Sequence, residues 1–388
     1  ILNAIMEVST NSVRFRRTLA GLVGNIIEWY DFSIFASVSD VLAEKFFQGS
    51  STSHETKRIF TFIIFGTGFL FRPLGAVVFG YLGDTRGRRF SLIVSVLVMS
   101  IATTLTGSLP TQGSGRWEIE NGAIVMLVIV RTVQGLSVGG ELIGTVVYTT
   151  ETAPGAKWGF YGALPFSTIC LGVVLGLIVQ AALRKSLGEK AFADYGWRIC
   201  FWFGGVMGML AFFARKWMDE TSLFNETEKL KNPFKAAVTT HRTVMLVVAI
   251  TSGMLSTIFY IYFIWVQTLL TEHLGVSFMN SSIVIAVNLL LTTVLLPLFG
   301  HLSDSKGRTE VMLFGGIGAI LLSVPVLAMV VYVEHTTTKT VVSAFAIALM
   351  SVVFSAWGGP MPAWFVEGVP AEARYVQQVW LYLSPNIG

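Results

Sequence analysis

The chain consists largely of apolar runs of about 20 residues, and this feature restricts its fold more than any other. A helix rises about 1.5 Å per residue, so such a run spans the roughly 30 Å hydrocarbon core of a bilayer. Only 13% of the 388 residues are charged, against about 25% in an average soluble domain. We therefore predict an all-α, multi-pass protein surrounded by the lipid bilayer. The predicted spans cover residues 18–38, 59–81, 90–109, 122–149, 158–183, 197–216, 243–269, 280–301, 310–333 and 341–365.

Basic residues set the predicted orientation. The 27 lysines and arginines lie mostly between the apolar runs, and the net charge is only +4. Most of them fall on the inner side if the N-terminus is cytoplasmic, in agreement with the positive-inside rule. The basic character therefore reflects topology and calls for no nucleic acid partner. Both cysteines, Cys170 and Cys200, lie in apolar runs, which argues against a disulfide framework and against a metal site.

An internal repeat divides the chain. The sequence GYLGDTRGR at 80–88 recurs as GHLSDSKGR at 300–308, each after the second span of a half. We expect an N-terminal six-helix bundle at residues 1–218, a cytoplasmic linker at 219–242 and a C-terminal bundle at 243–388. The repeat also predicts partners near 376–434 for the fifth and sixth helices of the first half. The sequence ends at residue 388, so we expect most of an eleventh helix, starting near 376, and all of a twelfth to be missing.

Charged residues inside the spans are the candidates for chemistry, because burying a charge in a membrane is costly. From the helix rise, Glu28, Arg72 and Glu141 lie about 15–18 Å from the cytoplasmic ends of their helices, and Asp31 lies about one turn beyond Glu28. A cluster of acids around one arginine suits proton coupling, because burial favours the neutral acid and a nearby arginine favours the ionised one. The alternative is a buried ion pair that only fixes helix packing.

Other intramembrane residues are weaker candidates. Arg131 and Gln134 fit a cavity role or a helix-packing role equally well. Aromatic side chains could line a cavity, although lipid-facing or core positions are more common in helices this apolar. WGGPMP at 357–362 should loosen the backbone of the tenth helix, and the glycines at 135, 139 and 140 should permit close helix contact. The aromatic candidates for a substrate cavity are Tyr30, Tyr260, Tyr262 and Trp357.

The two repeat loops suggest a cytoplasmic gate. Each connection is a tight turn in which Gly87 or Gly307 can take a positive φ. Asp84 or Asp304 can then cap a helix, while Arg88 pairs with Glu151 and Arg308 pairs with Glu367. Such pairs would hold one conformation and break in another, unless the loops serve only as positive-inside anchors. The predicted gate comprises Gly80, Asp84, Gly87, Arg88, Glu151, Gly300, Asp304, Gly307, Arg308 and Glu367.

These motifs resemble a known family. The paired loops, together with RTVQG at 131–135, are similar to the major facilitator superfamily of secondary transporters. GNIIEWYDF at 24–32, FRPLGAVVFG at 71–80, GWRICF at 196–201 and DETSLF at 219–224 resemble its metabolite:proton symporters. The resemblance covers nearly the whole chain and implies twelve helices, alternating access and a central cavity. It also implies substrates such as 2-oxoglutarate, citrate, shikimate, proline or betaine.

We therefore predict a monomeric secondary transporter that couples proton movement to a small organic acid or zwitterion. The proton gradient replaces any cofactor, and neither a metal site nor an enzymatic constellation is evident. Glu28, Asp31 and Glu141 are the proton-carrier candidates, and Arg72 is the substrate-binding candidate. The plasma membrane is the expected location. The alternatives are an uncoupled facilitator and a truncated, non-transporting membrane protein.

Overall fold

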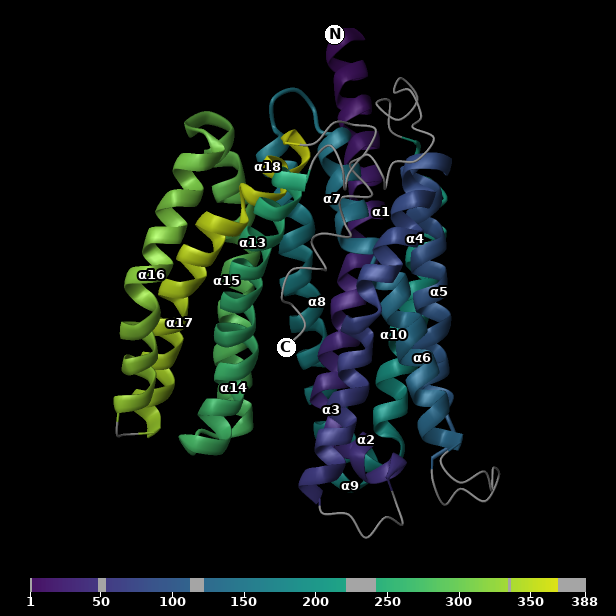
Figure 1. Cartoon of the computed structure of the whole chain (residues 1–388), viewed down its shortest axis with the longest axis vertical. Coiled ribbons are helices and arrows are strands. Elements are labelled where there is room, and N and C mark those ends of the chain that lie inside the picture. Colours follow the sequence, from purple (N-terminus) through teal and green to yellow (C-terminus); the bar gives the residue numbers. More distant parts are fainter. Residues whose placement is uncertain (1, 48–53, 112–121, 221–241, 334–335, 369–388) are drawn as a thin grey trace.

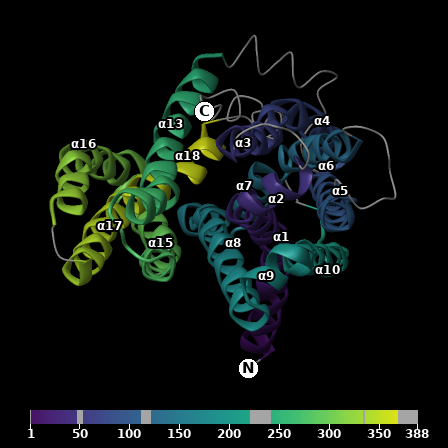
Figure 2. The same cartoon turned by 90° about the horizontal axis from the view of Figure 1, so that it is seen from below.

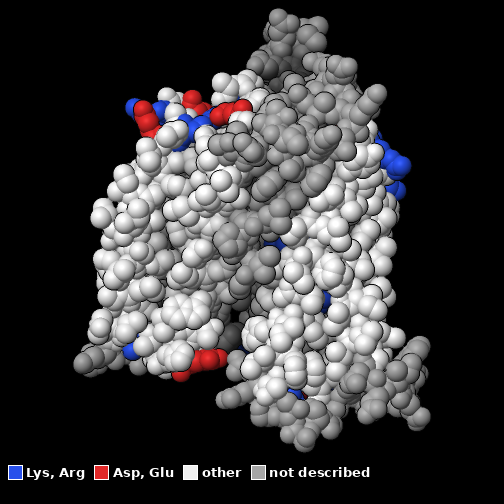
Figure 3. Space-filling view, viewed as in Figure 1, with Lys and Arg blue, Asp and Glu red and all other residues white. Residues whose placement is uncertain are grey.

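The computed structural model describes residues 2–47, 54–111, 122–220, 242–333 and 336–368. Every regular element within these ranges is a helix. Eight helical segments of this part of the chain are long and apolar enough to cross a membrane. In the space-filling view, the visible charged residues gather toward the two ends of the molecule, and the broad belt between them is mostly uncharged (Figure 3). This distribution is that of an integral membrane protein.

The helices up to residue 215 form a first group (Figure 1). Short helices lie between the long ones where the chain turns, at the end of the molecule opposite the 80–88 loop. The members are α1 (Leu2–Ser37), α2 (Ser39–Phe46), α3 (His54–Leu70), α4 (Arg72–Arg86), α5 (Arg88–Ser108), α6 (Gly122–Val138), α7 (Glu141–Glu151), α8 (Trp158–Leu187), α9 (Glu189–Ala191), the π-helix η1 (Phe192–Gly196) and α10 (Trp197–Arg215).

The helices from residue 242 onward form a second group beside the first (Figures 1 and 2). The predicted linker lies mostly outside the described residues, as does the predicted start of an eleventh helix near 376. The members of the second group are α13 (Arg242–Phe259), the π-helix η2 (Tyr260–Trp265), α14 (Val266–Thr268), the π-helix η3 (Leu269–His273), α15 (Phe278–Lys306), α16 (Arg308–Tyr332), α17 (Thr336–Gly358) and α18 (Met361–Glu367).

The two groups meet mainly where α8 packs along α15, as the view along the helices shows (Figure 2). One continuous apolar cluster includes Trp29 and Phe166 of the first group and Phe259 and Leu296 of the second. Figure 3 shows a recess between the groups at the end where α14 lies. The groups are therefore joined on one side and separate on the other.

Three runs that the sequence analysis treats as continuous are broken in the structure. The first breaks at Phe71, where Pro73 lies at the start of α4 and cannot donate a backbone hydrogen bond. The second breaks at Gly139 and Gly140, between α6 and α7. The third breaks between Gly358 and Met361, within the WGGPMP segment that was predicted to be loosened. After two of these breaks, the next helix begins at a charged residue that was predicted to belong to the site. These helices are α4, which begins at Arg72, and α7, which begins at Glu141.

Close helix contacts explain the glycines next to these breaks. A side chain at Gly139 would overlap the backbone carbonyl of Arg72, and one at Gly135 would overlap that of Gly68. The backbones of α6, α3 and α4 therefore approach closely only because these positions lack a Cβ atom. This confirms the predicted close contact, and it holds the backbone of Arg72 against α6.

Candidate functional site

Asp31 lies in a closed network with residues of α5 and α6. Its carboxylate accepts hydrogen bonds from Arg131 Nη1 (2.9 Å), Thr103 Oγ1 (3.0 Å) and Gln134 Nε2 (3.0 Å). Arg131 also donates to Gln134 Oε1 (2.8 Å), and its guanidinium lies 4.0 Å from the ring centre of Phe35. All of these polar side chains are buried. The network therefore fully satisfies the carboxylate of Asp31 and ties α1 to α5 and α6.

Glu141 lies in a second network. Its carboxylate accepts hydrogen bonds from Ser95 Oγ (2.7 Å) and from both terminal nitrogens of Arg215, Nη1 at 2.8 Å and Nη2 at a shorter distance. Arg215 also donates to the carbonyl oxygens of Gly21 (2.8 Å) and Leu92 (2.6 Å). A bidentate pair of this kind is strong and geometrically specific. One arginine thus joins α1, α5, α7 and α10.

Glu28 occupies a different environment. Its side chain is 0% exposed, and Oε1 lies 4.0 Å from Nη2 of Arg72. Within the described structure neither carboxylate oxygen accepts a hydrogen bond. The guanidinium of Arg72 lies over the rings of Phe32 (4.3 Å) and Phe69 (4.4 Å). Glu28 and Arg72 therefore form a long pair among aromatic rings, unlike the short pairs of the other two acids.

The predicted single cluster of acids around Arg72 is thus divided into three separate pairs. The helix rise gives each residue's depth along its own helix, but it does not give the neighbour that the side chain faces. Asp31 turns to Arg131 and not to Arg72, because residues three apart differ in direction by about 60° and meet different helices. Arg131 and Gln134 accordingly take the helix-packing position, one of the two roles left open for them.

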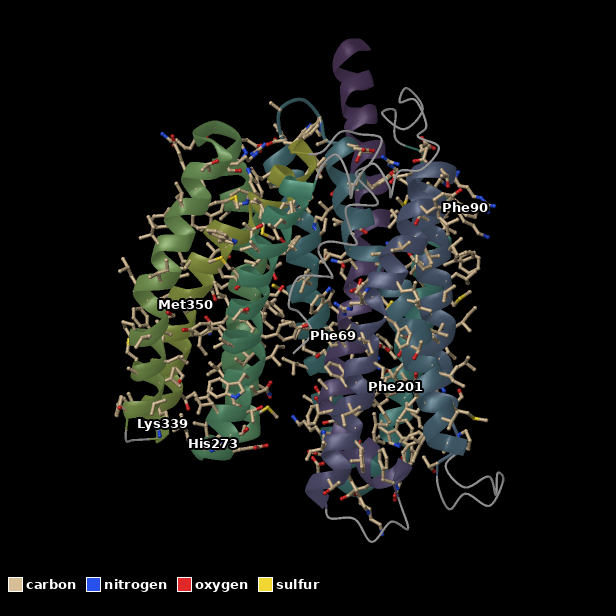
Figure 4. The ribbon with its side chains drawn as sticks, viewed as in Figure 1. Phe69, Phe90, Phe201, His273, Lys339 and Met350 are labelled. Carbon is tan, nitrogen blue, oxygen red and sulfur yellow. The ribbon has the colours of Figure 1, made fainter. Side chains whose placement is uncertain are left out.

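A pocket lies between the two groups. It holds about 680 Å³ of space not filled by atoms, including its opening to solvent. Arg72 and Tyr260 are the predicted site residues that line it, and Figure 4 shows Phe69 on the side of the first group that faces the second. The full lining is Trp29, Phe69, Arg72, Leu142, Phe166, Ile169 and Cys170 from the first group, and Ser252, Leu255, Ser256, Phe259, Tyr260, Phe354 and Met361 from the second.

Three predicted cavity residues lie elsewhere. Tyr30 donates to the carbonyl oxygen of Cys200 (2.7 Å), within the first group. Tyr262 donates to the carbonyl oxygen of Ser323 (2.7 Å), within the second. Trp357 packs against Gly315 and Gly316 of α16. None of these three side chains lines this pocket in the described structure, because their faces of the helices pack inside one group.

The first repeat loop brings its predicted partners together. Gly87 has a φ of 116°, and Gly80 is buried on α4. Arg88 donates to Asp84 (2.8 Å), and its Nη2 lies 3.6 Å from Glu151 Oε1. Glu220 also accepts from the backbone N–H of Arg88 (2.9 Å), which caps the start of α5. This cap could not be predicted from spacing, because Glu220 lies far from α5 along the chain.

The second repeat loop joins the two groups. Gly307 has a φ of 101°, and Arg308 donates to Asp304 (2.6 Å) and Glu367 (2.8 Å). Asp304 accepts from the backbone N–H groups of Gly159 (2.7 Å) and Phe160 (3.2 Å), in the first turn of α8. It therefore caps a helix of the other group, where a negative charge also interacts favourably with the helix dipole.

Two glycines make this contact possible. A Cβ atom at Gly159 would overlap the carbonyl oxygen of Gly300, and one at Gly300 would overlap that of Gly159. The two helices thus touch backbone to backbone next to Asp304. At this end of the molecule, polar contacts and close packing therefore hold the described residues of the two groups together.

Comparison with known proteins agrees with this architecture. The family model of the Major Facilitator Superfamily matches residues 22–385. The alpha-ketoglutarate permease of Escherichia coli (strain K12) is 33% identical over 308 residues, which cover 79% of this chain and 69% of that protein. The proline/betaine transporter of the same organism is 29% identical, over 96% of this chain and 75% of the relative. The citrate-proton symporter of Klebsiella pneumoniae is also 29% identical, over 95% and 81%.

Solved structures show the same fold. The proton:xylose symporter XylE bound to 6-bromo-6-deoxy-D-glucose superposes with a TM-score of 0.80 at 16% sequence identity. The match covers 96% of this chain and 87% of that structure. The chain therefore belongs to the major facilitator superfamily, which places it among membrane transporters and not among enzymes.

Proposed function

We propose that this transporter is a proton-coupled symporter of a small organic acid or zwitterion, in which Glu28 carries the proton and Arg72 binds the substrate carboxylate. One observation carries the proposal. Glu28 is a buried acid without a hydrogen-bond donor in the described structure, and it lies 4.0 Å from the arginine that lines the pocket. A cofactor has no part in this mechanism.

The three pairs differ in how well they stabilise a charged carboxylate. Asp31 accepts three hydrogen bonds, and Glu141 accepts three, two of them from one guanidinium. Hydrogen bonds to the charged form of an acid oppose its protonation. Within the described structure Glu28 accepts no hydrogen bond, and Arg72 approaches it at 4.0 Å, so we expect it to be protonated most readily of the three candidates. Asp31 and Glu141 act in this proposal as packing residues.

Coupling follows from competition for Arg72. When a substrate carboxylate binds the guanidinium, Glu28 loses the counter-charge with which it pairs in the described structure and would be left as a buried anion without a hydrogen-bond donor. Such an anion is unstable in a low-dielectric site and takes up a proton. Substrate and proton therefore load together, because the substrate alone would leave Glu28 charged in a buried site.

Alternating access supplies the movement. In this proposal residues 1–218 and 243–388 form the two moving bundles, joined by the linker at 219–242, and the N-terminus faces the cytoplasm of a cell whose plasma membrane holds the protein. The contacts of Asp304 with α8 close the cytoplasmic side, and Arg88 and Arg308 hold the loops in place. The protein works as a monomer, because the pocket lies between the two groups of one chain.

The test uses the full-length protein in proteoliposomes. With an inward proton gradient, the unmodified protein should accumulate substrate above equilibrium. Glu28→Gln should keep substrate exchange but lose accumulation, and Arg72→Ala should lose substrate binding. Asp31→Asn is the matched control: it should lower the amount of folded protein without separating exchange from accumulation. Accumulation by Glu28→Gln would refute the role of Glu28, and exchange without accumulation by the unmodified protein would identify an uncoupled facilitator.

A further inference from the structure

We infer that the substrate carries one carboxylate and one alkylated ammonium group, as glycine betaine does, and that it is not a dicarboxylate. The inference rests on the proposed function only in taking Arg72 as the carboxylate site. It depends on the charges and the aromatic rings around the pocket. It does not depend on whether transport is coupled to protons.

The described part of the pocket offers one positive charge. Arg72 is the charged residue among the described lining side chains, and the other polar ones are Ser252, Ser256 and Tyr260, with the thiol of Cys170. Two other arginines of the first group, Arg131 and Arg215, are also 0% exposed. They are already bound to Asp31 and Glu141. One guanidinium binds one carboxylate in a bidentate manner. A second carboxylate would meet no cation among these residues.

The rest of the pocket is lined with aromatic rings from both groups. Trp29 of the first group meets Phe259 of the second edge to face, with ring centres 5.7 Å apart. Phe69 meets Tyr260 in the same way at 6.2 Å, and Phe354 lies 5.9 Å from Phe259. The five rings form a continuous wall, which we call the aromatic wall. The guanidinium of Arg72 already lies over two of them, Phe69 at 4.4 Å and Trp29 at 5.9 Å.

Aromatic faces attract cations and repel anions, because the face of the ring carries the negative part of its quadrupole. An alkylated ammonium also has an apolar surface, so little hydration is lost when it contacts these rings. A carboxylate placed there would lose its hydration without a donor or a counter-charge to replace it. The aromatic wall therefore selects for a quaternary or otherwise alkylated ammonium at the position where a dicarboxylate would put its second acid.

The test compares three small probes in an equilibrium binding assay on the purified full-length protein without a proton gradient. The probes are glycine betaine, 2-oxoglutarate and 3,3-dimethylbutanoate. The last has the shape of glycine betaine, but a neutral carbon replaces the positively charged nitrogen. A cation over an aromatic face contributes about 0.5–2 kcal/mol, so glycine betaine should bind about 2- to 30-fold more tightly than 3,3-dimethylbutanoate. 2-Oxoglutarate should bind more weakly than either monocarboxylate.

Two variants test whether the preference for glycine betaine arises at the aromatic wall. Phe354→Leu should reduce the preference for glycine betaine over 3,3-dimethylbutanoate and leave the affinity for the latter nearly unchanged. Phe263→Leu is the matched control, because Phe263 contacts both Phe259 and Phe354 but does not line the pocket. It should leave the preference intact. Equal affinities for the two monocarboxylates, or tighter binding of 2-oxoglutarate, would overturn the inference. Neither result bears on proton coupling, which only the accumulation assay with a gradient can refute.

Discussion

Replacing Asp304 by asparagine should open the gate end of the transporter. The carboxylate accepts two backbone hydrogen bonds from α8 and lies at the positive end of that helix's dipole. Asparagine keeps one acceptor of similar shape but loses the charge. A hydrogen bond to a charged group contributes about 1.5–3 kcal/mol, and a charge at a helix terminus contributes about 0.3–1 kcal/mol. The substitution should therefore weaken the closed state by about 2–3 kcal/mol, a shift of roughly 30- to 150-fold in the equilibrium between the closed and open states.

The native Cys170 reports this shift, because it lines the pocket between the two groups. In a Cys200→Ser background, a membrane-impermeant maleimide added from the cytoplasmic side should label Asp304→Asn faster than the parent protein. Glu310→Gln removes the same charge from an exposed position in the first turn of α16. It should leave labelling unchanged. An equal rate for Asp304→Asn and its parent, with both folded, would refute the gate argument, and so would an equal increase in the Glu310 control.

Three further predictions follow from the buried contacts. Arg215→Met should lower the thermal stability of the purified protein, because an unpaired buried Glu141 costs about 3–5 kcal/mol, and adding Glu141→Leu should restore most of the loss. Gly139→Ala should displace the backbone of Arg72 and weaken substrate binding at least tenfold in an equilibrium assay, while protein yield stays measurable. Gly300→Ala should separate α8 from α15 at the gate and raise cytoplasmic thiol labelling as Asp304→Asn does.

The sequence was sufficient for the fold and for the charge pairs at the helix ends, but not for the partners of the charges deeper in the helices. Apolar runs and the doubled loop predict the long helices and their division into two similar sets, because membrane thickness fixes helix length. The pairs Arg88 with Glu151 and Arg308 with Glu367 were also predictable, since short loops leave few possible neighbours. These are local or end-of-helix properties. They need no knowledge of how one helix is rotated against the next.

Arg215 shows what this reasoning misses. It lies at the last turn of its helix, so the sequence analysis counted it as a charge that sets topology. In the structure its long side chain reaches inward to Glu141 and to carbonyl oxygens of α1 and α5. Gly24 leaves the room for it, as a Cβ atom there would overlap the guanidinium. Only the packing of four helices reveals that partner, and no spacing along the chain encodes it.

One helix connects the gate with the pocket. α8 begins where Asp304 binds its first turn, and about ten residues later, roughly 15 Å along the axis, Ile169 and Cys170 line the pocket. Between these points Asn25 of α1 donates to the carbonyl oxygen of Pro165 (2.6 Å), so α8 is tied to the helix that carries Glu28. A substrate held by Arg72 and by rings of the second group would draw the two groups together across the pocket. Movement of α8 against α15 would then reach α1 directly, and in this way the proposed proton carrier on α1, Glu28, would respond to the proposed gate.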